Sequence, residues 1–327
     1  MTGIFRSNNP LNTFLLFVYG ILLKFGWLLH PQVPVVHKSD GFLFYRLVHF
    51  LAPYFNAYPK GYFLIVYLLL FTQAISFNQV IISRRMMQKN NYLPAMCYLL
   101  ITSFFGSWNV LSAPLIINTF SIWIWAKISN LNLNQHPKST LFNIGIAIGL
   151  TSFFYLPSFA IIIFVLLALV ITRPLKIAEW LITLLGLFIP WYFLASWLFM
   201  NNSVYSFRLT GMGVSTDQSF LFTPLLTGVI VFIFLMIISG LSFMRSFMSK
   251  QVLQVRKNWI LLLLYFLVSL GIPFIMMNLD ISYWLLALIP ASAFIGCALY
   301  YPRIKWIPAI LQWIMVGFCL YMEYFAK

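Results

Sequence analysis

The chain has 327 residues, of which 62% are hydrophobic and only 8% are charged. Soluble domains carry about a quarter charged residues, so this composition excludes a soluble enzyme and leaves no room for a nucleotide-binding domain. The net charge of +15 arises from 20 Lys and Arg against 5 Asp and Glu. In so apolar a chain it points to loop charges that orient membrane spans, not to a nucleic-acid partner.

Eleven apolar runs follow one another along the chain, and each is a candidate span because one crossing takes roughly 20 residues. The runs at 93–105 and 158–172 are short for a full crossing. In chain order they are Leu11–Leu29, Tyr62–Ile82, Leu93–Phe105, Val110–Ala126, Leu141–Leu156, Ser158–Thr172, Ala178–Phe199, Phe222–Phe243, Trp259–Met277, Ser282–Tyr300 and Ile307–Tyr324. We therefore expect an all-α bundle of about 11 transmembrane helices, forming a single integral membrane domain over residues 1–327.

The basic residues predict how these spans are oriented, because cytoplasmic loops are enriched in Lys and Arg. With the N-terminus inside and alternating spans, Lys24 lies within the first span and fourteen basic residues lie on the cytoplasmic side, thirteen in connections between spans and Arg6 before the first span. The basic residues left outside are Lys38, Arg46, Lys60, Arg208 and Lys327. This excess predicts an N-in, C-out topology with an odd number of spans. The two long loops, 30–60 and 201–221, then lie outside, where we expect the function.

Asp40, in the first long loop, is the acid best placed for chemistry. It precedes the stretch Phe42–Leu51, whose apolar residues recur with helical periodicity. The pattern predicts a helix in the outer interface, with its apolar face in lipid and Arg46 and His49 on the wet face. Asp40 would then either cap the N-terminus of this helix or act as a catalytic group.

Basic side chains in the outer loops suit a lipid phosphate, since a guanidinium binds phosphate oxygens through paired hydrogen bonds. Arg208 lies in a polar loop with two glycines. The candidate substrate-binding residues are Arg208, Arg46, Lys38, His37 and His49. Headgroup contact without a specific ligand is the alternative. Membrane lipids are the expected partners.

Cofactor and metal motifs are missing from the sequence. The three cysteines fall in apolar runs without a CxxC pair, and the spacing of His37, Asp40 and His49 is no zinc signature. We therefore expect no metal and no cofactor.

Other residues lead to structural expectations. The GxxxG of Gly145 and Gly149 predicts close helix packing. Glu179 is expected to pair with Lys176 three residues earlier, whereas Lys24 has no evident acidic partner.

Several stretches resemble a family of polytopic inner-membrane proteins of Gram-negative bacteria, a domain of unknown function with no established activity. They are Gly3–Pro10, Leu111–Asn118, Phe154–Phe159 and Trp180–Tyr192. The resemblance covers most of the chain through apolar motifs, and it implies a location in the bacterial inner membrane.

The layout also resembles the GT-C membrane glycosyltransferases that use polyprenyl-phosphate sugars. Those enzymes start N-in, and their long first outer loop carries an acid followed by interfacial helices, as do Asp40 and Phe42–Leu51. They often have a second adjacent acid, where this chain has Gly41, and a folded outer domain, for which these loops are too short.

This resemblance implies sugar transfer from a polyprenyl-phosphate lipid, with Asp40 as general base and Arg208, together with Arg46, on the phosphate. A non-catalytic assembly component of the cell envelope and a lipid transporter or flippase are the alternatives.

Overall fold

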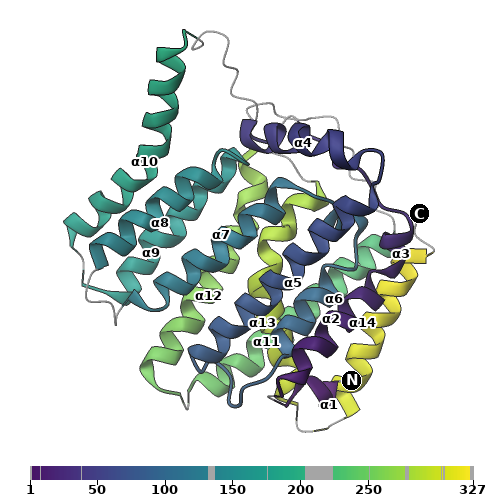
Figure 1. Ribbon diagram of the computed structural model, residues 1–327. Coiled ribbons are helices and arrows are strands. Elements are labelled where there is room, and N and C mark those ends of the chain that lie inside the picture. Colours follow the sequence, from purple (N-terminus) through teal and green to yellow (C-terminus); the bar gives the residue numbers. More distant parts are fainter. Residues whose placement is uncertain are drawn as a thin grey trace.

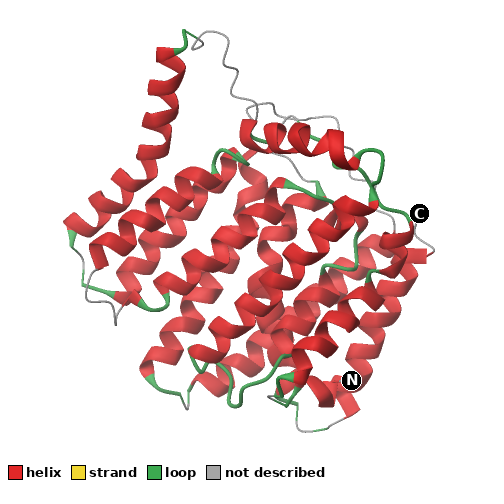
Figure 2. Cartoon of the chain, in the orientation of Figure 1, coloured by secondary structure: helices red, strands yellow, loops and turns green. Residues whose placement is uncertain are grey.

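The structure is a computed structural model that describes residues 2–7, 9–37, 39–131, 137–174, 176–202, 224–249, 251–276, 280–302, 304 and 306–324. This part of the chain consists of helices joined by loops, without a named strand (Figures 1 and 2). The α-helices are α1 (Thr2–Phe5), α2 (Leu11–Leu23), α3 (Phe25–Leu29), α4 (Phe42–Phe55), α5 (Lys60–Ser83), α6 (Leu93–Ile101), α7 (Ala113–Ile128), α8 (Pro137–Thr151), α9 (Ile161–Thr172), α10 (Ile177–Met200), α11 (Pro224–Met248), α12 (Leu253–Gly271), α13 (Leu285–Tyr300) and α14 (Trp306–Tyr324). Four 3-10 helices are η1 (Gly106–Asn109), η3 (Leu156–Ala160), η4 (Ile272–Met276) and η5 (Ile281–Trp284).

Most helices lie side by side in one bundle, and α4 lies across one end of it (Figure 1). We call this end the α4 end and the opposite one, which holds α1, the α1 end. α2 starts at the α1 end, whereas α14 finishes at the α4 end beside α3. The start of α2 and the end of α14 therefore lie at opposite ends of the bundle.

Within the described residues, six helices are long and apolar enough to cross a membrane: Lys60–Ser83, Ile177–Met200, Thr227–Met248, Leu253–Ile275, Ile281–Tyr300 and Trp306–Glu323. Three shorter apolar helices are Leu11–Leu23, Ala113–Ile128 and Leu156–Thr172. Large apolar side chains also cover the outside of the bundle, such as Leu64 and Leu68 on α5 and Leu185 and Phe188 on α10. An apolar exterior around an apolar interior is the arrangement of a multi-pass membrane protein.

Helix α13 is the centre of the bundle, because every residue from Leu285 to Leu299 is buried. Its neighbours are α6, α7, α11, α12 and α14. Small residues such as Ala291 and Gly296 keep the helix thin, so that neighbours can approach it on all sides. The closest approach is that of Gly240 on α11, where an added Cβ would meet the carbonyl oxygen of Phe294.

The predicted close packing at the GxxxG motif is confirmed. A Cβ on Gly145 of α8 would meet the backbone carbonyl of Thr183, and one on Gly149 would meet the carbonyl of Leu187, both on α10. Gly186 of α10 approaches the Phe142 carbonyl of α8 in the same way. The two helices therefore touch through their backbones.

The predicted pairing of Glu179 with Lys176 is wrong. Glu179 is buried in the first turn of α10, and its carboxylate lies 3.9 Å from the guanidinium of Arg173. Arg173 directly follows α9, and the short connection between the two helices brings it next to the buried acid. Sequence spacing within one helix therefore gave the wrong partner.

Gly240 and Gly228 provide a matched pair for testing the contact with α13. We expect Gly240→Ala to destabilise the bundle by about 1–3 kcal/mol, because the methyl group collides with the Phe294 backbone. Gly228→Ala, on the same helix with nothing within 4 Å of the new Cβ, should instead stabilise by up to about 1 kcal/mol. Thermal unfolding in detergent measures both, and equal effects would contradict the packing described.

Candidate functional site

The first long loop is attached to the end of α8 just before α4 begins. The amide of Gly41 donates to the carbonyl of Phe154 at 2.7 Å, and that of Leu43 donates to Phe153 at 3.1 Å. Asp40 and Tyr155 form an isolated antiparallel bridge. Phe153 and Phe154 follow the last turn of α8, where backbone carbonyls lack a partner within the helix. The loop and the start of α4 supply that partner. Glycine is needed at 41 because a Cβ there would meet the Phe153 carbonyl.

Both carboxylate oxygens of Asp40 accept hydrogen bonds. The hydroxyl of Tyr283 donates to Oδ1 at 3.0 Å, and the backbone N–H of His37 donates to Oδ2 at 2.9 Å. The Tyr283 hydroxyl also lies 2.6 Å from the Ser39 hydroxyl. Asp40 is only 2% exposed, so the carboxyl is enclosed by the loop and by η5.

The interpretation of Asp40 as a helix cap is wrong. The N-cap residue of α4 is Gly41, and no side chain makes a capping bond there. Asp40 lies one residue too early and turns its carboxyl toward Tyr283 instead. It therefore fastens the loop to the start of α13, not to the helix that follows it.

Burial raises the pKa of Asp40 to about 6. The bonds from His37 N–H and the Tyr283 hydroxyl act in the opposite direction, because they stabilise the charged form, whereas the negative charge of nearby Asp280 raises the pKa further. The Asp40 carboxyl therefore changes its charge close to neutral pH, unlike an exposed aspartate.

A second acid reaches the same place from the turn before η5. The imidazole Nε2 of His37 lies 3.7 Å from Oδ2 of Asp280. The structure thus gathers His37, Asp40, Asp280 and Tyr283, which we call the Asp40 cluster. Asp280 and Tyr283 could not be recognised from the sequence as partners of Asp40, since about 240 residues separate them from it along the chain. The sequence offered one indication: the charge pattern puts Asp280 in an outer turn, on the same side as the first long loop.

The predicted helix is confirmed as α4, with Arg46 and His49 on its exposed face, but the prediction that its apolar face lies in lipid is wrong. Its apolar residues Leu43, Leu47 and Leu51 pack against the core of the bundle and do not face lipid. The reason is that α4 crosses the apolar ends of the other helices and covers them (Figure 1).

Two of the predicted binding residues lie on the exposed face of α4. The guanidinium of Arg46 lies 6.0 Å from the ring centroid of Trp197 on α10. The His49 ring stacks with Tyr45 at a centroid distance of 6.2 Å. Neither makes a described hydrogen bond with Asp40. Lys38 and Arg208 lie outside the described residues.

A second polar cluster lies where the first span breaks between α2 and α3. Lys24 at the break is completely buried, and its Nζ donates to Asn109 Oδ1 at 2.6 Å and Thr102 Oγ1 at 3.1 Å. Oε1 of Glu323 on α14 accepts hydrogen bonds from the backbone N–H groups of Gly26 and Trp27. An acid of the last span thus fixes the broken helix through its backbone, whereas the described partners of Lys24 are neutral side chains.

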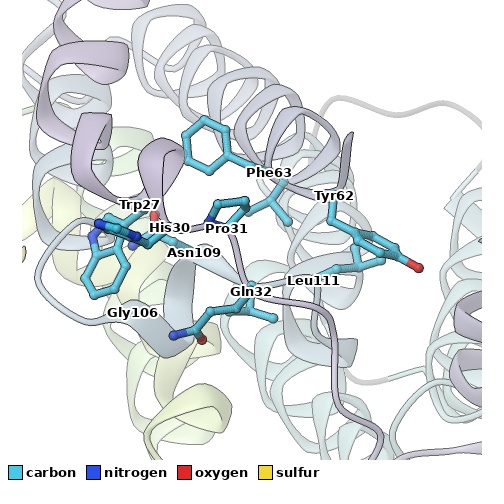
Figure 3. Close-up of a pocket in the computed structure, with 11 residues that line it drawn as sticks. Trp27, His30, Pro31, Gln32, Tyr62, Phe63, Gly106, Asn109 and Leu111 are labelled. Carbon is cyan, nitrogen blue, oxygen red and sulfur yellow. The ribbon is translucent and has the colours of Figure 1, made fainter. Parts of the chain in front are cut away.

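Beside this cluster, a small cavity is lined by Trp27, His30, Gln32, Tyr62 and Asn109, among others (Figure 3). Its volume is about 10 Å³, which is the space of about one water molecule. It can therefore hold a solvent molecule but not a sugar or a lipid headgroup.

Comparisons with protein-family models, with curated proteins and with solved structures found no match to this chain. Functional arguments therefore have to come from the residues themselves.

The burial of Asp40 makes the stability of the folded chain depend on pH. A carboxyl whose pKa is higher in the folded than in the unfolded chain binds protons more tightly when folded. We therefore expect stability to fall by about 3 kcal/mol in total as the pH rises from about 3 to about 7, with most of the loss between about pH 4 and about pH 6.

Thermal unfolding of the wild type and of Asp40→Asn over this pH range measures the effect. The substitution removes the titrating group and should flatten the profile. Tyr283→Phe removes a donor that favours the charged form, so it should extend the decline to higher pH. An unchanged profile in Asp40→Asn would assign the pH dependence to another group.

Proposed function

We propose that the chain crosses the membrane 11 times, with the N-terminus in the cytoplasm, the C-terminus outside and the α4 end at the outer face. Contacts between loops support this orientation. Trp108 Nε1 donates to the carbonyl of Ile281 at 2.7 Å, which joins two loops that the charge count puts outside. At the α1 end, Trp259 Nε1 donates to the carbonyl of Met86 at 2.9 Å, and Met86 directly follows two arginines.

Tags at the two termini test the topology. A cytoplasm-active reporter should work only at the N-terminus, and one that needs the outer compartment only at the C-terminus. Tags that report the same side would contradict an odd number of crossings.

For the activity, we propose sugar transfer from a polyprenyl-phosphate donor at the outer leaflet of a bacterial inner membrane. The observation that carries this proposal is the Asp40 cluster. It joins a carboxyl whose pKa is about 6, a second carboxyl, an imidazole and a phenol at the end of the bundle that α4 crosses. Catalytic groups are commonly tuned in this way, since a base works best with a pKa near the working pH.

In the proposed reaction, the acceptor hydroxyl takes the place that Tyr283 holds on Asp40 Oδ1. Asp40 removes its proton while the acceptor oxygen bonds to the anomeric carbon of the sugar. The bond from this carbon to the phosphate oxygen breaks, and polyprenyl phosphate leaves with the negative charge. Arg46 and Arg208 are the proposed partners of that phosphate, because a guanidinium stabilises the growing charge.

The burial of Asp40 favours a second function, that of a non-catalytic component of an envelope assembly. The side chain is 2% exposed, and both its oxygens already bind groups of the protein. An aspartate that only fastens the first loop needs no access for a substrate. In this alternative the loop would be held in shape for a partner protein.

A deletion strain separates the two functions. We expect it to lose a glycan from envelope lipids or proteins, which wild type restores and Asp40→Asn does not, because loss of a general base costs about 10²–10⁴ in rate. Arg208→Ala should give a partial loss. Lys176→Gln, at an exposed residue before α10, serves as the control for expression and folding.

Mass spectrometry of lipid-linked and protein-linked glycans gives the readout. Unchanged glycans in the deletion strain would exclude the transferase. Full restoration by Asp40→Asn would leave Asp40 with its anchoring role and support the assembly component.

A further inference from the structure

A lateral groove of about 510 Å³ lies between α5 and α7. Four polar residues of α5 line it, Thr72, Ser76, Gln79 and Ser83, and all four are exposed. Their spacing of four, three and four residues places them on one face of the helix. The opposite wall includes Ile122 and Trp123 of α7. This part of α5 therefore presents a mixed polar and apolar surface at the side of the bundle. Nearer its start, α5 exposes leucines such as Leu64 and Leu68.

A buried hydrogen-bond network holds the floor of this groove. Nε2 of Gln73 donates to the Leu115 carbonyl at 2.7 Å and to Thr119 Oγ1 at 2.8 Å, and its Oε1 accepts from the Tyr98 hydroxyl at 2.7 Å. Gln73 is 2% exposed and joins α5, α6 and α7 at one point. The groove therefore has a fixed shape and does not depend on a ligand to form.

Two cations stand at the α1 end of the groove. Arg84 directly follows α5 and donates to Ser129 Oγ at 3.1 Å and Asn130 Oδ1 at 2.9 Å, so it bridges the ends of α5 and α7. Lys127 of α7 is exposed, with its Nζ 5.6 Å from the ring centroid of Trp123 in the groove wall. The ion pairs of the described residues involve other side chains, so no described carboxylate neutralises these two cations.

We propose that this groove binds an anionic phospholipid, with its phosphate at Lys127 and Arg84 and one acyl chain lying along α5 toward Thr72. The lengths agree. Eleven residues separate Thr72 from Ser83, which is about 16 Å along a helix, and half of the hydrocarbon core of a bilayer is about 15 Å. The groove therefore spans one leaflet, from the charged interface to the middle of the membrane.

The end of the groove nearest the cations matches the polar groups of such a lipid. The cations are at the interface, where the phosphate lies. Ser83 and Gln79 come next, at the depth of the glycerol and ester oxygens, and they can donate hydrogen bonds to them. Ile122, Trp123 and Val80 add apolar wall at the depth of Gln79, and Thr72, Ser76 and Thr119 line the deeper part of the groove. Basic pockets between spans on the cytoplasmic side commonly bind anionic headgroups.

A second copy of the chain is a poorer occupant on grounds of charge. Packing α5 against α5 about a two-fold axis would bring two sets of Arg84 and Lys127 together, and like charges at an interface repel. An anionic phosphate neutralises the same two cations. The charges therefore favour the lipid over self-association.

Native mass spectrometry of the full chain in detergent, titrated with phosphatidylglycerol or with zwitterionic phosphatidylcholine, tests the proposal. We expect preferential binding of phosphatidylglycerol. Lys127→Gln should weaken it about fivefold, the amount commonly associated with one basic residue at a membrane surface. Lys176→Gln, another exposed lysine before α10, should leave it unchanged. Ser76→Trp, which fills the groove, should remove the bound lipid, with thermal unfolding as the check on folding.

Equal binding of the two lipids, or equal losses in Lys127→Gln and Lys176→Gln, would overturn the proposal. Cross-linking of Ser76→Cys identifies the rival occupant. The native cysteines Cys97, Cys297 and Cys319 are all buried, so a disulfide-linked dimer would show that a second copy fills the groove, and this result too would overturn the lipid site. A monomer that keeps phosphatidylglycerol supports it.

Discussion

The fold depends on one constraint: in an apolar surrounding, each backbone N–H and carbonyl must find a partner within the protein. Helices meet this constraint locally, and the described structure is accordingly built of helices. The difficult places are the helix ends and breaks. At the end of α8, the amides of Gly41 and Leu43 satisfy the carbonyls of Phe154 and Phe153. At the break between α2 and α3, Glu323 satisfies the free amides of Gly26 and Trp27.

The few buried polar side chains act as connectors between distant segments. Asp40 joins the first loop to Tyr283, Lys24 joins the first span to Asn109, and Gln73 joins three helices. Each has several hydrogen-bond partners, as the cost of burying an unpaired polar group requires. Their positions also determine where function can arise, because the Asp40 cluster borders the α4 end and Gln73 forms the floor of the lateral groove.

These two regions offer different chemistry. The Asp40 cluster combines acids with proton donors and a carboxyl that titrates near neutral pH, which suits proton transfer. The groove combines uncompensated cations with a long, partly apolar wall, which suits a lipid held in place without reaction. Since the two regions border opposite ends of the bundle, the two proposed roles would not compete for one surface.

Composition and periodicity alone determined the helical class, the approximate positions of the apolar helices, the packing at Gly145 and the existence of α4, because these depend on local hydrophobicity and small residues. Tertiary structure decided which polar groups meet. Asp40 and Tyr283 are partners only because the first loop passes η5, which directly precedes α13. Glu179 binds Arg173 because the connection from α9 to α10 is short. The face of α4 was also decided by the bundle beneath it, since periodicity identifies an apolar face but not whether protein or lipid covers it.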